Sequence, residues 1–113
     1  MHEFGLTQAV VETASASARE AGAARVTEIR LTVGELTQVV EEAMDFAFEV
    51  LRRGTICEGA RLTIDFIAPR SRCLDCGIEF AHDALHRKCP ECESPFTQVI
   101  AGRELEITSI EVE

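Results

Sequence analysis

CLDCGIEFAHDALHRKCPEC, residues 73–92, carries four cysteines in two pairs, Cys73-x2-Cys76 and Cys89-x2-Cys92. Two intervening residues let both thiolates of a pair face the same ion, and the twelve residues between the pairs can bring the second pair round to complete a tetrahedron. Four thiolates leave no open coordination position, so this spacing predicts a structural metal rather than a catalytic one. Zinc is the expected ion, and iron in a rubredoxin-like site is the alternative.

Two segments before this stretch have the apolar spacing of helices. In residues 4–21, Leu6, Val10 and Ala14 begin a stripe that recurs at spacings of four and three. Residues 36–53 repeat this pattern, with a largely acidic opposite face. A glycine follows each segment, and glycine favours the end of a helix.

Three further segments alternate polar and apolar residues as half-buried strands do: residues 26–33, 62–66 and 105–112. The alternation of the third segment shifts phase near Thr108–Ser109, which predicts a bulge there. Residues 70–100 have little helix or strand periodicity. The fold class expected from this order is α/β (α+β), with a small three-stranded mixed sheet, two helices on one of its faces, and an inserted four-cysteine unit that is zinc-ribbon-like. The expected domains are residues 1–69 with 101–113, and residues 70–100.

The charge balance argues against several classes of partner. The 113 residues include 11 basic and 20 acidic side chains, which give a net charge of −9. Such a field repels phosphate backbones and anionic lipids, so neither nucleic acid nor a membrane is an expected partner. No apolar run approaches the ~20 residues that a membrane helix needs, and the start lacks the order of a secretory signal. We therefore expect a cytoplasmic protein, in which clustered cysteines bind metal rather than form disulfides.

The first three residues, Met1, His2 and Glu3, form a second candidate metal site. The α-amine of Met1 and the amide and imidazole nitrogens of His2 can form fused chelate rings around one ion. The amide of Glu3 or a carboxylate can supply the fourth donor. Planar nitrogen donors suit Ni(II) and Cu(II), whereas zinc prefers tetrahedral sites. Binding at this site should weaken as pH falls, because protons compete for the amine and the imidazole.

The remaining candidate residues predict no catalytic site. No Ser-His-Asp set, Cys-His set or GxxxxGK loop is evident, so a binding protein is expected rather than an enzyme. His82 and His86 could offer a weak second metal site, although solvated or packed histidines are the simpler interpretation. Cys57 lies outside both pairs and is expected to be a small core residue.

Four segments in order resemble one known family. They are MHEFGLTQAVVE at the start, VTEIRLTVGEL, CLDC–x12–CPEC and the closing LEITSIEVE. Together they resemble the HypA/HybF family of hydrogenase nickel-incorporation proteins. The resemblance implies a nickel metallochaperone that delivers Ni(II) to [NiFe] hydrogenases, and in some bacteria to urease. It also implies transient nickel binding at Met1, His2 and Glu3 and structural zinc at the four paired cysteines.

The same resemblance implies partners. They are the GTPase HypB and the hydrogenase large subunit, with urease accessory proteins where urease is served. A homodimer is also compatible with the sequence. Two alternatives remain from the residues themselves: a zinc-ribbon adaptor without nickel transfer, and an iron–thiolate electron carrier.

Two features depart from the family pattern. Phe4 and Gly5 follow the MHE start where many relatives have Leu-Ser, which predicts a later or frayed start of the first helix. No histidine adjoins either cysteine pair, whereas some relatives have one there and couple the zinc geometry to acid or nickel. That coupling is not expected in this chain.

Overall fold

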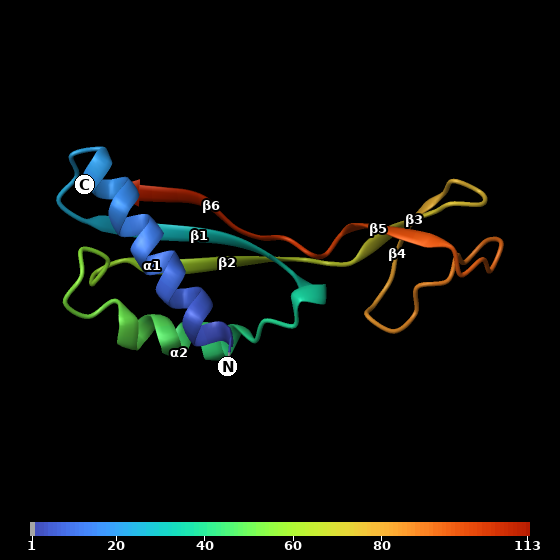
Figure 1. Ribbon diagram of the computed structural model, residues 1–113, viewed down its shortest axis with the longest axis horizontal. Coiled ribbons are helices and arrows are strands. Elements are labelled where there is room, and N and C mark those ends of the chain that lie inside the picture. Colours follow the sequence, from blue (N-terminus) through green and yellow to red (C-terminus); the bar gives the residue numbers. More distant parts are fainter. Residues whose placement is uncertain (1) are drawn as a thin grey trace. The chain divides into compact units, whose positions relative to one another are not determined.

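The computed structural model describes residues 2–113 (Figure 1). Along the chain, helix α1 (His2–Glu20) and strand β1 (Val26–Gly34) are followed by the 3-10 helix η1 (Glu35–Thr37), helix α2 (Glu41–Leu51) and strand β2 (Arg61–Ile67). Four more strands complete the order: β3 (Arg70–Cys73), β4 (Glu79–Ala81), β5 (Thr97–Ala101) and β6 (Leu105–Val112).

These elements belong to two compact units. The first comprises Met1–Leu31, Val39–Asp65 and Glu106–Glu113, and the second comprises Thr32–Gln38 and Phe66–Leu105. The first contains both α-helices, and the second contains the four paired cysteines.

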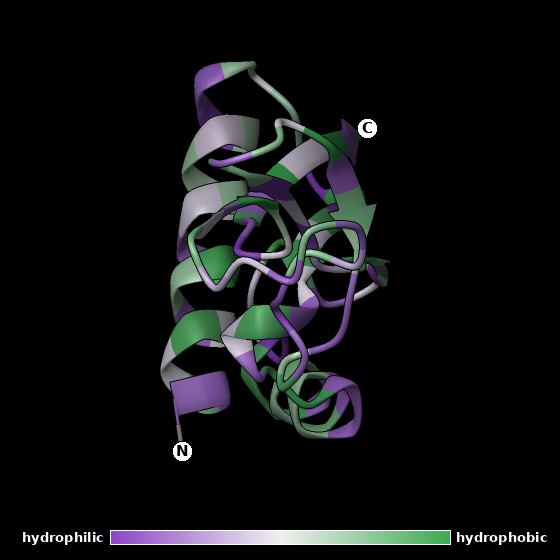
Figure 2. Cartoon of the chain, turned by 90° about the vertical axis from the view of Figure 1, so that its right-hand side faces the viewer, coloured by the Kyte–Doolittle hydropathy of each residue, from purple (hydrophilic) through white to green (hydrophobic). Residues whose placement is uncertain are grey.

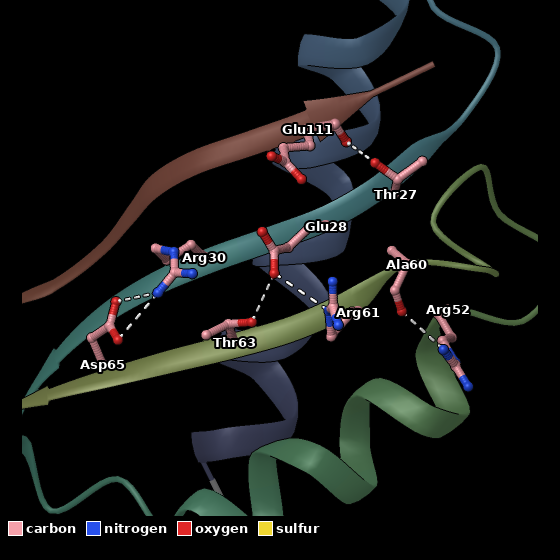
Figure 3. Close-up of polar contacts among 9 residues, drawn as sticks. All are labelled: Thr27, Glu28, Arg30, Arg52, Ala60, Arg61, Thr63, Asp65 and Glu111. Atoms are coloured by element: carbon pink, nitrogen blue, oxygen red, sulfur yellow. Dashed lines mark hydrogen bonds and ion pairs between the residues drawn. The ribbon is translucent and has the colours of Figure 1, made fainter.

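Strand β1 lies between β2 and β6 in a three-stranded sheet. Side-chain contacts pair Glu28 with Thr63 and Arg30 with Asp65, so β1 and β2 run in the same direction (Figure 3). Strand β6 runs in the opposite direction to β1. The amide of Ala24 donates a hydrogen bond to the carbonyl of Glu113, and the amide of Gly34, at the other end of β1, donates to the carbonyl of Glu104. The sheet is therefore mixed, as the sequence predicted.

The two faces of this sheet differ because side chains alternate along a strand. Ile29 and Leu31 of β1 are buried, whereas Glu28 and Arg30 contact the polar side chains of β2 on the other face (Figure 3). The helices α1 and α2 pack against each other. The core of the unit is completed by buried apolar residues of the two helices: Val11, Ala14, Ala18, Met44, Ala47 and Phe48.

Helix α1 begins at His2, so the predicted later or frayed start is wrong. Its buried face also differs from the predicted stripe, since Thr7 and Val11 are buried where Leu6 and Val10 are only partly so. Thr7 can be buried because its hydroxyl donates a hydrogen bond to the carbonyl of Glu3, at 2.7 Å. Hydrophilic and hydrophobic residues both occur along α1 in Figure 2, where the helix begins at the end marked N.

The second α-helix begins five residues later than predicted, at Glu41. The amide of Leu36 donates to the carbonyl of Gly102 at 2.8 Å, and the hydroxyl of Thr37 donates to the carbonyl of Gly34 at 2.7 Å. Gln38 then takes a left-handed backbone conformation, with φ of 63°. These contacts interrupt a segment whose apolar spacing alone favours one continuous helix.

The second unit contains an antiparallel sheet in the order β4-β3-β5. The strands β3, β4 and β5 are short, and their sequences RSRC, EFA and TQVIA do not alternate clearly between polar and apolar residues, so the sequence did not reveal them. The buried hydrophobic cluster of this unit is small, consisting of Cys73, Phe80 and Cys89 with Ile78 partly buried against them. So little apolar burial makes metal binding important for this unit. Within residues 2–113, no helix is long and apolar enough to cross a bilayer.

Candidate metal centres

The four paired cysteines converge on one point. The sulfur atoms of Cys73, Cys76, Cys89 and Cys92 all lie within 4.8 Å of one another. The sulfurs of Cys73 and Cys92 are 3.6 Å apart, and those of Cys76 and Cys89 are 3.5 Å apart. The predicted grouping is thus present, and it is the only group of three or more metal-binding side chains within residues 2–113.

The two pairs form matching turns. In each pair the amide of the second cysteine donates toward the sulfur of the first, at 3.4 Å in Cys73–Cys76 and 3.5 Å in Cys89–Cys92. The residue after each pair then has positive φ, with 83° at Gly77 and 60° at Glu93. Glycine takes this conformation easily, which explains the glycine that follows the first pair.

A side-chain hydrogen bond joins the two turns. Asp75 lies inside the first pair, and its carboxylate accepts a hydrogen bond from the hydroxyl of Ser94, two residues beyond the second pair. Ser94 is buried, and its hydroxyl also accepts from the amide of Phe96 at 3.1 Å. Sequence reasoning did not find this contact, because only the folded cysteine cluster brings residues 75 and 94 together.

The sulfur cluster favours a bound cation. The amide of Cys76 lowers the pKa of the Cys73 thiol to about 6. The amide of Ser94 lowers the pKa of Cys92, but the neighbouring Cys73 sulfur and burial outweigh it and raise that pKa to about 12. Four thiolates this close repel one another unless a positive ion lies among them. A tetrahedral divalent ion relieves that repulsion, and the all-sulfur donor set fits structural zinc.

At the N-terminus, the structure describes His2 and Glu3, while the predicted ligand Met1 lies outside the described residues. The side chain of His2 is 58% exposed, and that of Glu3 is 7% exposed. Nδ1 of His2 and Oε1 of Glu3 are 3.8 Å apart. The imidazole is therefore accessible to an ion from solution, and the neighbouring carboxylate is not.

Glu3 anchors the first turn of α1 to the start of α2. Its Oε2 accepts a hydrogen bond from the amide of Val40 at 3.1 Å, and Val40 is the residue that precedes α2. This bond lowers the pKa of the Glu3 carboxyl below its ordinary value of 4.5. The contact spans 37 residues and could not be inferred from the sequence.

Glu3→Ala should lower the thermal midpoint of unfolding by several degrees at pH 7. Because the Glu3 pKa is lowered in the folded state, its contribution is fully present above the ordinary value of 4.5 and disappears only as pH falls through the folded value. Differential scanning calorimetry of zinc-loaded protein measures the shift. Glu12→Ala is the control, since Glu12 is an exposed acid of the same helix. Equal midpoints for the two variants would show that Glu3 is no anchor.

The other candidate residues take structural roles. Nε2 of His82 lies 2.7 Å from the hydroxyl of Ser71, and its Nδ1 lies 2.7 Å from the carbonyl of Asp83. His86 contacts the carboxylate of Asp83 instead, at 2.8 Å. The two histidines thus contact different groups of Asp83, its carbonyl and its carboxylate, and only His82 also contacts Ser71. Cys57 is buried beside Ser15, as expected of a core residue.

The fold and these two centres define a class of small metal-binding proteins with an accessible N-terminal histidine and a separate four-cysteine unit. The family described as "Hydrogenase/urease nickel incorporation, metallochaperone, hypA" matches residues 1–112. The chain belongs to this family, which confirms the resemblance seen in the sequence.

Individual relatives match the chain over its length. The hydrogenase maturation factor HypA of Geotalea uraniireducens is 42% identical over 113 residues, which covers 100% of both chains. The hydrogenase maturation factor HypA of Methanocaldococcus jannaschii is 40% identical, over 100% of this chain and 98% of its own. The solution structure of the Ni metallochaperone HypA from Helicobacter pylori has the same fold, with a TM-score of 0.70 at 24% identity and coverage of 99% and 97%.

Proposed function

We propose that this protein is a nickel metallochaperone, which binds Ni(II) at its N-terminus and delivers it during maturation of [NiFe] hydrogenase. Membership of the nickel-incorporation family supports this function. The observation that carries it is the pairing of an exposed His2 with a buried, anchored Glu3 at the start of α1. An exposed imidazole next to a fixed first turn suits an ion that must be both taken up and released.

The proposed nickel ligands are Met1, His2 and Glu3. The α-amine of Met1 and the amide and imidazole nitrogens of His2 supply three donors with the planar preference of Ni(II). An amide in the first turn of a helix has no acceptor within that helix, so binding there costs no helical hydrogen bond. The Glu3 carboxylate is already occupied by Val40, so Glu3 contributes its backbone or its positioning of the turn rather than a carboxylate ligand.

Release of nickel follows from the same arrangement. Donors at an accessible chain end can be exchanged one at a time for ligands of a receiving protein, whereas an enclosed site would have to open. Protons compete with Ni(II) for nitrogen donors, so acid favours release. None of these steps needs a catalytic group, and the function is that of a binding protein rather than an enzyme.

We propose that the two metals are bound by two different domains. Residues 1–69 with 101–113 form the nickel-binding domain, and residues 70–100 form the zinc-binding domain. Zinc at Cys73, Cys76, Cys89 and Cys92 is closed to further ligands and stabilises the second domain.

The proposed setting is the cytoplasm, where the partners are the GTPase HypB and the hydrogenase large subunit. Urease accessory proteins are further partners where a urease is served, and a homodimer is compatible with the fold. The description of relatives as hydrogenase maturation factors supports HypB and the hydrogenase large subunit among these partners.

A titration of Ni(II) into zinc-loaded protein with its native N-terminus tests the function. The visible d–d absorption should report about one planar Ni(II) per chain. His2→Ala should reduce the affinity at least about 100-fold, because it removes one donor and one chelate ring, as should a single residue added before Met1, which displaces the α-amine. His86→Ala is the control, since His86 is also exposed but lies in the second unit. Equal binding by all four proteins would overturn the N-terminal site and favour a zinc adaptor.

A further inference from the structure

Strand β5 lies at an edge of the second unit's sheet. The order β4-β3-β5 leaves β5 paired on one side only, with β3 (Figure 1). A hollow of about 540 Å³ runs along this strand, lined by Leu74, Arg87, Thr97, Gln98, Val99 and Arg103. An edge strand beside a hollow is a place where an extended peptide can add as a further strand.

Apolar side chains are exposed next to this hollow. Leu74 is 62% exposed and Phe96 is 65% exposed. A backbone hydrogen bond of 2.9 Å from Leu74 to Phe96 holds the two residues side by side. The core of this unit is small, yet these two large apolar side chains are exposed to solvent instead of buried in it. Adjacent exposed apolar side chains are typical of a surface that contacts another protein.

The charge of the hollow is opposite to that of the chain. Five arginines make ion pairs with carboxylates, at Arg25, Arg30, Arg52, Arg61 and Arg72. Within residues 2–113, Arg19, Arg53, Arg70, Arg87 and Arg103 make none, and of these Arg87 and Arg103 line the hollow. The nearby acid Glu104 accepts a hydrogen bond from the amide of Gly102 at 2.8 Å instead. Two guanidinium groups are therefore left for carboxylates from elsewhere.

We propose that the β5 edge docks an extended acidic segment of a partner protein. The segment's backbone would pair with β5, its carboxylates would pair with Arg87 and Arg103, and an apolar side chain would cover Leu74 and Phe96. Local charge complementarity selects this occupant, since the two arginines that line the hollow, Arg87 and Arg103, attract carboxylates. The surface contains none of the proposed nickel ligands, so docking can be measured on zinc-loaded protein to which no nickel has been added.

Fluorescence anisotropy with the full zinc-loaded chain tests the proposal. The probe is a fluorescein-labelled peptide of sequence GEVEVEG, and its neutral counterpart is GQVQVQG. The acidic peptide should bind at least about tenfold tighter than the neutral one, because it can form charge-assisted hydrogen bonds with both Arg87 and Arg103 that the neutral peptide lacks. In an added strand, every second peptide amide points toward β5 and the others point away from it. N-methylation of the first set should therefore weaken binding, and N-methylation of the second set should not.

Charge reversal locates the surface. The double variant Arg87→Glu and Arg103→Glu should lose peptide binding at least about tenfold and keep its zinc content. Arg19→Glu with Arg53→Glu is the matched control, because it makes the same change of charge in the first unit. An equal loss of peptide affinity in both double variants would show that binding depends only on the net charge of the chain, which would overturn the proposal.

Two further outcomes would also overturn the proposed occupant. Tighter binding of a fluorescein-labelled decauridine than of the acidic peptide, dependent on Arg87 and Arg103, would identify a nucleic-acid surface. A dimer of the unmodified protein in sedimentation velocity that the charge-reversed variant abolishes would identify a second copy of the chain. Perturbation of the β5 amides by the peptide in a nitrogen–proton correlation spectrum, with no dimer, would support strand addition.

Discussion

Serine in place of Cys89 should unfold the second unit and leave the helices of the first unit folded. The buried hydrophobic cluster around the zinc ligands of the second unit consists of Cys73, Phe80 and Cys89, with Ile78 beside them. Burial of one phenylalanine contributes about 2 kcal/mol, whereas a structural zinc ion contributes on the order of 10 kcal/mol at neutral pH. Loss of one ligand from a closed four-thiolate site should therefore remove most of the stability of this unit.

The measurement combines zinc content with a nitrogen–proton correlation spectrum. In the Cys89→Ser variant, amides of residues 70–100 should collapse to random-coil positions, while those of α1 and α2 stay dispersed. Chelation of zinc from the unmodified protein should give the same spectrum. Cys57→Ser is the control, because Cys57 is equally buried but lies outside the cluster. Dispersed amides in metal-free Cys89→Ser protein would show that the unit folds without its ion.

Alanine in place of Gly34 should destabilise the protein by at least about 3 kcal/mol, at the upper end of the overpacking range. A Cβ atom on Gly34 would lie 2.0 Å from the carbonyl carbon and oxygen of Gly102 and 2.4 Å from the amide nitrogen of Arg103. All three are backbone atoms and cannot rotate away. The two backbone hydrogen bonds between these chain segments would have to break. In them the amide of Gly34 donates to the carbonyl of Glu104 at 2.7 Å, and the amide of Leu36 donates to the carbonyl of Gly102 at 2.8 Å.

Urea unfolding of the zinc-loaded variants measures this effect. Gly59→Ala is the matched control, because its Cβ would meet no atom within 4 Å and its backbone is not left-handed. The control should stay within about 0.5 kcal/mol of the unmodified protein. If Gly34→Ala were equally mild, the two chain segments would not approach as closely as the structure has them.

The parts of the structure that were predictable from sequence rest on local patterns. The cysteine cluster was predictable because two residues between ligands and a flexible arm suffice to bring thiolates together. Strand β6 was predicted at 105–112 and occurs at Leu105–Val112, and β1 was predicted at 26–33 and ends one residue later. In β1 the alternation of polar and apolar residues matches the faces that the fold buries and exposes, whereas in β6 only Ile107 and Ile110 are partly buried and the apolar Leu105 and Val112 are exposed.

The parts that were not predictable rest on distant contacts. The start of α2 depends on the bond of Leu36 to Gly102, 66 residues along the chain, which apolar spacing does not reveal. The buried face of α1 includes Thr7, whose hydroxyl is satisfied only once the helix has formed. The role of Glu3 as an anchor depends on Val40, and the presence of glycine at position 34 depends on Gly102.

The position of β6 has a consequence for synthesis of the protein. Strand β6 borders β1 in the first sheet, yet it follows all four paired cysteines in the chain. A ribosome therefore completes the zinc ligands before it produces the third strand of that sheet. Few residues separate the last zinc ligand, Cys92, from β6, so the ribosome still encloses that ligand when it produces the strand. Capture of zinc should therefore follow the synthesis of β6, and the two metal sites should be completed in the same period.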